Sequence, residues 1–221
     1  MNFSHRRKVI KLLSFGLSAF GLTILFVSIW PIVVYQLTNA RSYSTLLSPL
    51  VLEKKDETKE PTDYTKASTW FPTADTKDFE ESKVDFYTIT IPKLKIEDAI
   101  VAIGGEDLSK HLVQYPGTAL PGRNGNAVIF GHSILPIFYN PKNYMAIFST
   151  LPTLKNGDQI FVKFDGVSYD FVVEELFEIY PTDIQILEQN NSDSFLTLVT
   201  CTPPGDPRNP KRLIVRARVV S

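Results

Sequence analysis

The chain is poor in cysteine, in histidine and in net charge, and each scarcity excludes a class of function. A single cysteine, Cys201, excludes an internal disulfide and CxxC metal or redox sites. The three histidines, His5, His111 and His132, lie far apart and form no HExxH motif, so a zinc site is not expected. The net charge of -1 provides no broad basic field for nucleic acid. The sequence contains no GxGxxG or Walker motif, and nucleotide binding therefore has no support.

An uninterrupted apolar run follows the basic N-terminus. Residues 12–37 carry no charge and exceed the ~20 residues that a helix needs to cross a bilayer. Basic residues gather within residues 1–11, whereas Arg41 alone follows the run closely. By the positive-inside rule we expect a cytoplasmic segment over 1–11, an uncleaved transmembrane anchor over 12–37, and the rest outside the cell. The alternative is a signal peptide cleaved near Thr38-Asn39-Ala40, although the apolar part of such peptides spans only ~7–15 residues.

Residues 38–83 are expected to form an extracytoplasmic linker. Glu53–Pro61 and Asp75–Lys83 are charged and nearly free of apolar residues, a composition that buries too little surface to offset ordering entropy. Trp70-Phe71-Pro72 interrupts the polar segment. Three outcomes are open for these aromatic residues: they remain in a floppy spacer, dock on the folded domain, or form a lid over its active site.

Residues 84–221 have the pattern of a β domain. Short runs rich in β-branched and aromatic residues are separated by turn residues, and Asp165-Gly166 between two of them is a strong hairpin signal. So many short strands favour a closed barrel or a sandwich. Short helices are expected at Asp107–Gln114 and Asn143–Leu151. The eight expected strands are Phe86–Ile91, Ala99–Ile103, Asn126–His132, Gln159–Phe164, Val167–Val173, Glu175–Tyr180, Phe195–Thr200 and Arg212–Val220.

Three residues near the ends of expected strands could together perform acyl transfer. His132 closes one strand, Cys201 ends another before a proline-rich loop, and Arg212 opens the last. A thiolate attacks a carbonyl, a guanidinium stabilises the resulting oxyanion, and an imidazole protonates the leaving amine. The alternatives are an inert buried cysteine and two rival arginines, Arg208 and Arg216. Arg212 is favoured because it alone opens a β run.

Other polar residues near these positions are weaker candidates. Asn126 and Ser133 could orient the imidazole or line a substrate groove, and Thr200 could place its hydroxyl there. Glu106-Asp107 and Glu174-Glu175 are acidic pairs, but their spacing matches no defined calcium loop. We therefore expect neither a metal ion nor a cofactor.

Three segments resemble the sortase family. Thr197-Leu198-Val199-Thr200-Cys201 resembles its TLxTC signature, and Gly131-His132-Ser133 resembles the segment that carries its catalytic histidine. Arg212-Leu213-Ile214-Val215 is similar to its arginine-opened final strand. The chain order of histidine, cysteine and arginine also agrees, as does the single N-terminal apolar segment. The resemblance covers residues 84–221.

This resemblance implies a membrane-anchored cysteine transpeptidase. Its fold would be mostly β, a closed eight-stranded barrel with short helices after one N-terminal transmembrane helix. With His132, Cys201 and Arg212 as catalytic residues, it would cleave an LPxTG-like sorting signal of surface proteins through a thioester on Cys201. It would then pass the protein to an amine of the cell wall or of a pilin. The alternatives are a hydrolytic membrane-anchored cysteine peptidase and an anchored binding barrel without chemistry.

Overall fold

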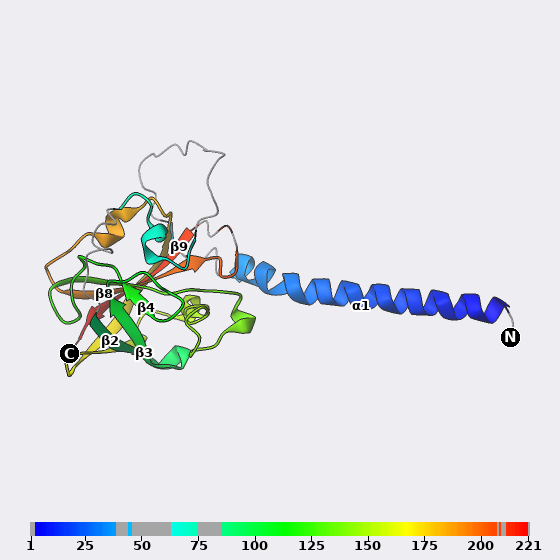
Figure 1. Cartoon of the computed structure of the whole chain (residues 1–221), viewed down its shortest axis with the longest axis horizontal. Coiled ribbons are helices and arrows are strands. Elements are labelled where there is room, and N and C mark those ends of the chain that lie inside the picture. Colours follow the sequence, from blue (N-terminus) through cyan, green and yellow to red (C-terminus); the bar gives the residue numbers. More distant parts are fainter. Residues whose placement is uncertain are drawn as a thin grey trace. The chain divides into compact units, whose positions relative to one another are not determined.

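The computed structural model divides into two compact units, Met1–Arg41 and Ser42–Ser221. The first consists of α1 (Phe3–Thr38), a single helix that includes both the apolar run and most of the basic segment before it (Figure 1). Among the helices in the described part of the chain, none has the length and hydropathy needed to cross a membrane. The charged runs Glu53–Pro61 and Asp75–Lys83 lie outside the described residues. The structure describes residues 3–38, 44–45, 63–74, 85–206, 208 and 211–220.

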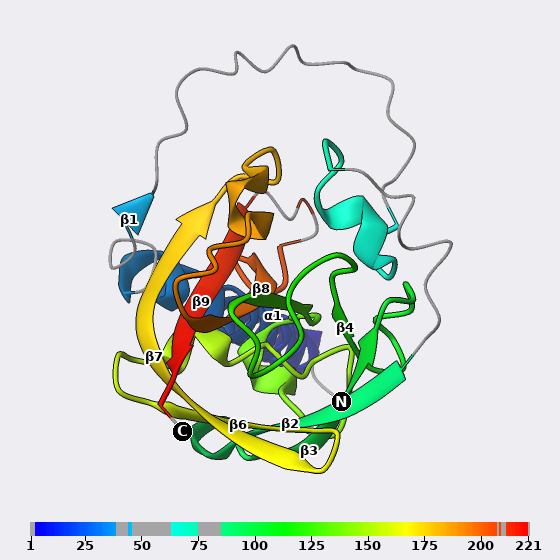
Figure 2. The same ribbon diagram turned by 90° about the vertical axis from the view of Figure 1, so that its left-hand side faces the viewer.

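The second unit is built on a closed β-barrel. Eight strands join in the order β7-β6-β2-β3-β4-β5-β8-β9, and pairing of β9 with β7 closes the ring (Figure 2). The two-residue strand β1 (Ser44–Thr45) pairs in parallel with β7. The barrel confirms the predicted mostly β, eight-stranded fold. Its strands are β2 (Asp85–Ile91), β3 (Ile96–Ile103), β4 (Leu112–Gln114), β5 (Gly125–Phe130), β6 (Gln159–Phe164), β7 (Val167–Ile179), β8 (Ser194–Thr202) and β9 (Lys211–Val219). Its 3-10 helices are η1 (Ala67–Trp70), η2 (Pro92–Leu94), η3 (Pro136–Phe138), η4 (Leu151–Thr153) and η5 (Ile184–Leu187).

Two errors in the expected strands cancel in the count. Val167–Val173 and Glu175–Tyr180, expected as two strands, belong to the single strand β7, which bends at a β-bulge where its register with β9 shifts. Asp107–Gln114, expected as a helix, is instead a turn followed by β4, which pairs with β3 and β5. A three-residue strand is too short to show a recognisable pattern in the sequence. It is a strand here because it pairs with two neighbouring strands.

Two further boundaries differ from the expected ones. β5 ends at Phe130, so His132 lies in the loop just beyond the strand. Asn143–Leu151, expected as a short helix, is a series of turns that leads into η4. There Asn143 Oδ1 accepts a hydrogen bond from the Met145 backbone N–H at 3.0 Å. Such a local side-chain bond competes with the helical pattern of the backbone.

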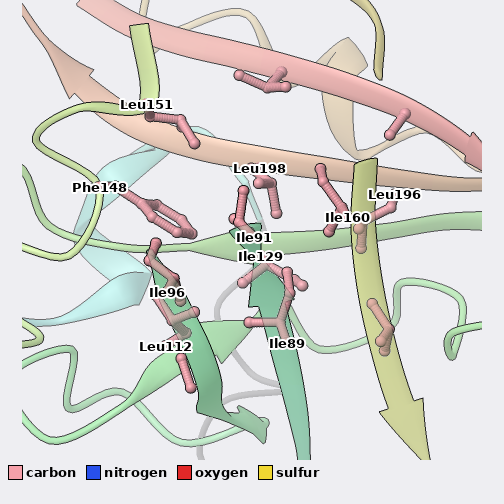
Figure 3. Close-up of a cluster of buried hydrophobic side chains, with 14 of the residues drawn as sticks. Ile89, Ile91, Ile96, Leu112, Ile129, Phe148, Leu151, Ile160, Leu196 and Leu198 are labelled. Carbon is pink, nitrogen blue, oxygen red and sulfur yellow. The ribbon is translucent and has the colours of Figure 1, made fainter. Parts of the chain in front are cut away.

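Buried residues form two hydrophobic clusters on opposite faces of the same strands. The barrel interior holds the larger cluster, which includes Leu196 and Leu198 of β8 (Figure 3). The second cluster includes Val199 and Cys201 of the same strand. Because successive residues of a strand point to opposite faces, Cys201 lies on the outer face of the barrel. The fold therefore places the thiol outside the barrel interior, within the second cluster.

Candidate active site

β8 and β9 bring the thiol and the guanidinium side by side. Cys201 is the next-to-last residue of β8, and Arg212 is the second residue of β9. The antiparallel register pairs these two residues directly. Directly opposed residues point to the same face, with Cβ atoms ~4.5–5.5 Å apart. Both side chains therefore lie on the outer face of the barrel.

β5 supplies the imidazole from the other side of β8. The two strands are parallel, and Phe130, the last residue of β5, is paired with Val199. The pairing extends into the loop, because the Gly131 N–H donates to the Val199 carbonyl at 3.1 Å. His132 and Cys201 each lie two residues beyond the paired Phe130 and Val199, so they lie at the same level along these two neighbouring chain segments. The sequence separates the three candidate catalytic residues widely, whereas three adjacent strands bring them to one end of the barrel.

Two side-chain hydrogen bonds tie the His132 loop to β8. The Thr200 hydroxyl donates to the Gly131 carbonyl at 2.7 Å, and the Ser133 hydroxyl donates to the Cys201 carbonyl at 2.8 Å. The bonds lie on either side of His132 in sequence, so they hold the imidazole loop against the strand of the nucleophile. Thr200 and Ser133 thus have scaffold partners here, and substrate binding by either one stays a prediction.

Asn126 and Gln189 fasten the connection between β7 and β8 onto β5. The Asn126 amide donates to the Ile186 carbonyl at 3.0 Å and accepts from the Thr197 hydroxyl at 2.7 Å. The Gln189 side chain accepts from the Asn126 N–H at 2.9 Å and donates to the Asn126 carbonyl at 3.2 Å. Asn126 therefore has scaffold partners here, and its contact with a substrate stays a prediction. Sequence reasoning missed Gln189, because a glutamine in a polar loop carries no local signal.

Residues 63–74, the covering segment, contact His132 and Arg212 through Trp70. Figure 1 shows this segment in cyan. Trp70 and Phe71 are fully buried. The Trp70 ring lies 5.3 Å from Arg212 Cζ and 5.8 Å from the His132 ring. The Trp70 backbone carbonyl accepts a hydrogen bond from Arg212 Nη2 at 3.1 Å. The docking of these aromatic residues on the folded domain, one of the outcomes left open by the sequence, is confirmed.

Hydrogen bonds to backbone carbonyls hold the covering segment in place. The Trp70 indole N–H donates to the Tyr64 carbonyl at 2.9 Å, which closes the segment on itself. The Ala67 N–H donates to the Glu106 carbonyl at 3.0 Å, and the Leu108 N–H donates to the Thr65 carbonyl at 3.0 Å. The segment is thereby fastened to the loop between β3 and β4. With the segment in this position, Cys201 and Arg212 are 3% and 1% exposed.

Burial determines the protonation of the thiol and the imidazole. It lowers the pKa of His132 to about 4, although the negative charges of Asp63 and Asp107 act to raise it. Burial also raises the pKa of the Cys201 thiol, although the positive charge of Arg212 opposes that shift. Both groups are therefore neutral at pH 7 while covered. His132 Nε2 has no hydrogen-bond partner within the part of the chain that the structure describes.

The two rival arginines lie away from the thiol. The Arg208 side chain is exposed and makes paired hydrogen bonds to the Asp206 carboxylate at 3.0 and 2.6 Å. The Arg216 guanidinium lies 4.5 Å from the centre of the Phe195 ring, farther along β9. Of the three, Arg212 alone is the register partner of the cysteine.

The acidic pairs that the sequence offered as calcium ligands include side chains engaged in ordinary surface interactions. Asp107 accepts from Ser109 and forms an ion pair with Lys110 at 2.7 Å. Glu174 accepts from the Arg218 guanidinium at 2.6 Å. Among the described residues, no group of three His, Cys, Asp or Glu side chains could hold a metal ion.

Opening the covering segment should increase the reactivity of Cys201. Trp70→Ala removes the ring that shields His132 and Arg212 and lets water reach the thiol. Hydration lowers the pKa of the thiol and raises that of the imidazole, so the thiolate fraction at pH 7 rises. Each pKa unit changes that fraction about tenfold. We therefore expect alkylation by iodoacetamide, measured by intact mass, to be at least about tenfold faster.

Phe138→Ala, which removes an exposed aromatic ring, is the control. Equal rates in Trp70→Ala and wild type would show that the segment does not restrict access.

Comparison with known proteins gives consistent matches. Residues 89–220 match the family model of the Sortase domain. Sortase A of Streptococcus agalactiae is 26% identical over 132 residues, which are 59% of this chain and 51% of that protein. The chain thus spans about half the length of that curated relative. A Clostridium perfringens Sortase D5 transpeptidase superposes with a TM-score of 0.54 at 28% identity, covering 66% of this chain and 86% of its own. The pilus-related Sortase C of Group B Streptococcus gives a TM-score of 0.54 at 27% identity, covering 64% and 70%.

Proposed function

Because this chain belongs to the sortase family, we propose that it is a cysteine transpeptidase with Cys201, His132 and Arg212 as its catalytic residues. The observation that carries the proposal is the direct pairing of Cys201 with Arg212 across β8 and β9. It places a guanidinium beside the only thiol in the chain. The parallel pairing of β5 with β8 supports the role of His132, because it brings the imidazole loop to the same end of β8.

The first half of the reaction forms a thioester. Cys201 Sγ, as the thiolate, attacks the scissile carbonyl carbon, and the Arg212 guanidinium donates hydrogen bonds to the developing oxyanion. His132 in its protonated form gives its proton to the leaving amine as the C–N bond breaks. Arg212 Nη2 donates a hydrogen bond to the Trp70 backbone carbonyl, which supports binding of a substrate peptide oxygen by this guanidinium.

The second half of the reaction returns the enzyme to its starting state. An incoming amine attacks the thioester carbonyl and loses a proton to neutral His132, and the C–S bond breaks to release the thiolate. We propose that the substrate is an LPxTG-like sorting signal and that the amine belongs to the cell wall or to a pilin. The pilus-related relative supports a pilin as one acceptor. Water in place of the amine would give simple hydrolysis.

Product analysis with and without an added amine tests this proposal. A labelled LPxTG peptide is incubated with the enzyme and increasing triglycine, and the products are separated by chromatography and mass. A transpeptidase should give an amide product that grows with triglycine at the expense of the free acid. Free acid alone at every triglycine concentration would favour the hydrolytic peptidase, and no product together with an unreactive thiol would favour the binding barrel.

We further propose that residues 12–37 are a single-pass anchor in the cell membrane, with residues 84–221 outside. The support is the uncharged run itself and the basic residues that precede it. Protease added to intact cells or spheroplasts should cleave between residues 38 and 83 and release the barrel. Full protection of the domain, or a mature N-terminus at Arg41, would contradict the anchor.

A further inference from the structure

Glu178 of β7 is a buried carboxylate with two partners next to the catalytic residues. Its side chain is 5% exposed. One carboxylate oxygen accepts a hydrogen bond from Lys211 Nζ at 3.0 Å, and the other accepts from the Thr202 hydroxyl at 3.2 Å. Thr202 directly follows Cys201, and Lys211 directly precedes Arg212. One side chain on a third strand therefore contacts the immediate neighbours of both the nucleophile and the arginine.

These contacts lie at the last rung of the ladder between β8 and β9. Thr202 and Lys211 are register partners, and the next pair inward is Cys201 with Arg212. Beyond this rung both strands continue into their connecting loop. The end of a ladder opens more readily than its middle, because it has fewer neighbouring pairs. The catalytic pair therefore depends on a terminal rung that Glu178 spans from β7.

Stability alone is a poor account of an ion pair whose carboxylate is buried. Removing a carboxylate from water costs several kcal/mol, and apolar residues of similar volume are often as stable as a buried pair. A second ion pair, between Glu174 and Arg218, also joins β7 to β9 at a separation of 2.6 Å. Its desolvation cost is lower, because these two side chains are 34% and 51% exposed. The burial of Glu178 therefore calls for a role connected with its location.

We propose that Glu178 is a positioning residue for transpeptidation, which holds Cys201 and Arg212 in register by clamping Thr202 and Lys211. The inference rests on the proposed function. Without the clamp, the terminal rung opens and the guanidinium drifts from the point where the oxyanion forms. A misplacement of about 1 Å can cost on the order of 10²-fold in rate. Partial opening should cost less than that.

The clamp itself is tested by hydrogen exchange, with no reference to activity. Glu178→Gln keeps an acceptor for the Thr202 hydroxyl but loses the charge that holds Lys211. In full-length protein we expect faster deuterium uptake in peptides over residues 200–202 and 211–213, with unchanged uptake over 194–198. Glu174→Gln, which breaks the exposed pair between the same strands, should leave all three regions unchanged. Unchanged uptake over 200–202 and 211–213 in Glu178→Gln would overturn the proposal.

The positioning role is tested by kinetics below the unfolding temperature of every variant. We expect Glu178→Gln to lower kcat about tenfold with KM nearly unchanged, and Glu174→Gln to leave both constants unchanged. If Glu178 acts through Lys211, then Lys211→Met and the double variant should lose the same amount as Glu178→Gln. Additive losses, or a loss confined to KM, would overturn that role.

The two proposals fail in distinguishable ways. If wild type makes no amide product while Glu178→Gln still raises uptake at the terminal rung, the proposed function fails and the clamp stands. If wild type is active and Glu178→Gln matches its kcat, the positioning role fails and the proposed function stands. Should Glu178→Gln not fold, Lys211→Met takes its place in both measurements. This substitution removes the other partner of the ion pair, and the Lys211 side chain is 29% exposed.

Discussion

Replacing Cys201 with alanine should abolish both peptide cleavage and the thioester intermediate. The chain contains no other thiol that could take over as nucleophile. The change removes one sulfur atom from the outer cluster beside Val199 and Ile214, so the barrel should still fold. Cleavage is followed by chromatography of a sorting-signal peptide, the thioester by intact mass, and the fold by circular dichroism.

This variant also separates chemistry from binding. A folded Cys201→Ala protein should retain affinity for the peptide, because Arg212 and His132 remain. Cleavage of the peptide by folded Cys201→Ala would refute the assignment of the nucleophile and with it the proposed transpeptidase.

Replacing Arg212 with lysine should lower the rate on the order of 10²–10³-fold, the usual loss when an oxyanion donor is removed. The guanidinium uses separate nitrogens for separate partners: Nη2 donates to the Trp70 carbonyl at 3.1 Å and Nη1 to the Lys211 carbonyl at 3.2 Å. It also lies against the Tyr64 and Trp70 rings, at 5.5 and 5.3 Å from their centres. An ammonium keeps the charge but lacks this planar fork.

Arg208→Lys is the matched control for Arg212→Lys. The Arg208 side chain is exposed and bonded to Asp206, so its replacement should leave kcat within about twofold, since exposed ion pairs contribute little. Steady-state turnover of the sorting-signal peptide gives both values. A severe loss in Arg208→Lys with a mild one in Arg212→Lys would transfer the role to Arg208.

The sequence predicted the parts of the site that depend on strands with strong local pattern. β8 and β9 are long, rich in β-branched residues and close in sequence, so their pairing follows from their order. β5 has the same character. Once these three strands are recognised, the residues at their ends become candidates for one site. His132, Cys201 and Arg212 are predicted as candidates in this way, with help from the family signatures.

The parts that could not be predicted depend on contacts between distant segments. β4 is a strand only because β3 and β5 flank it, and the covering segment is ordered by its fit over Phe130, His132 and Arg212. Nothing in the sequence around Glu178 distinguishes it from other polar positions of a strand. Its burial becomes visible only when the end of β7 meets the ends of β8 and β9. The amino-acid composition of a segment does not reveal which distant segments it will contact.

The covering segment also bears on how long the enzyme survives between substrates. Oxidants attack the thiolate, and an accessible sulfenic acid is rescued when a second thiol condenses with it to a disulfide. This chain has no second cysteine, so further oxidation to the sulfinic acid would be permanent. Cys201 is 3% exposed and its thiol is kept neutral by burial, so the thiol is a poor target for peroxide. The working lifetime of the molecule is then determined by how often the covering segment opens, and each opening exposes the thiol to substrate and oxidant alike.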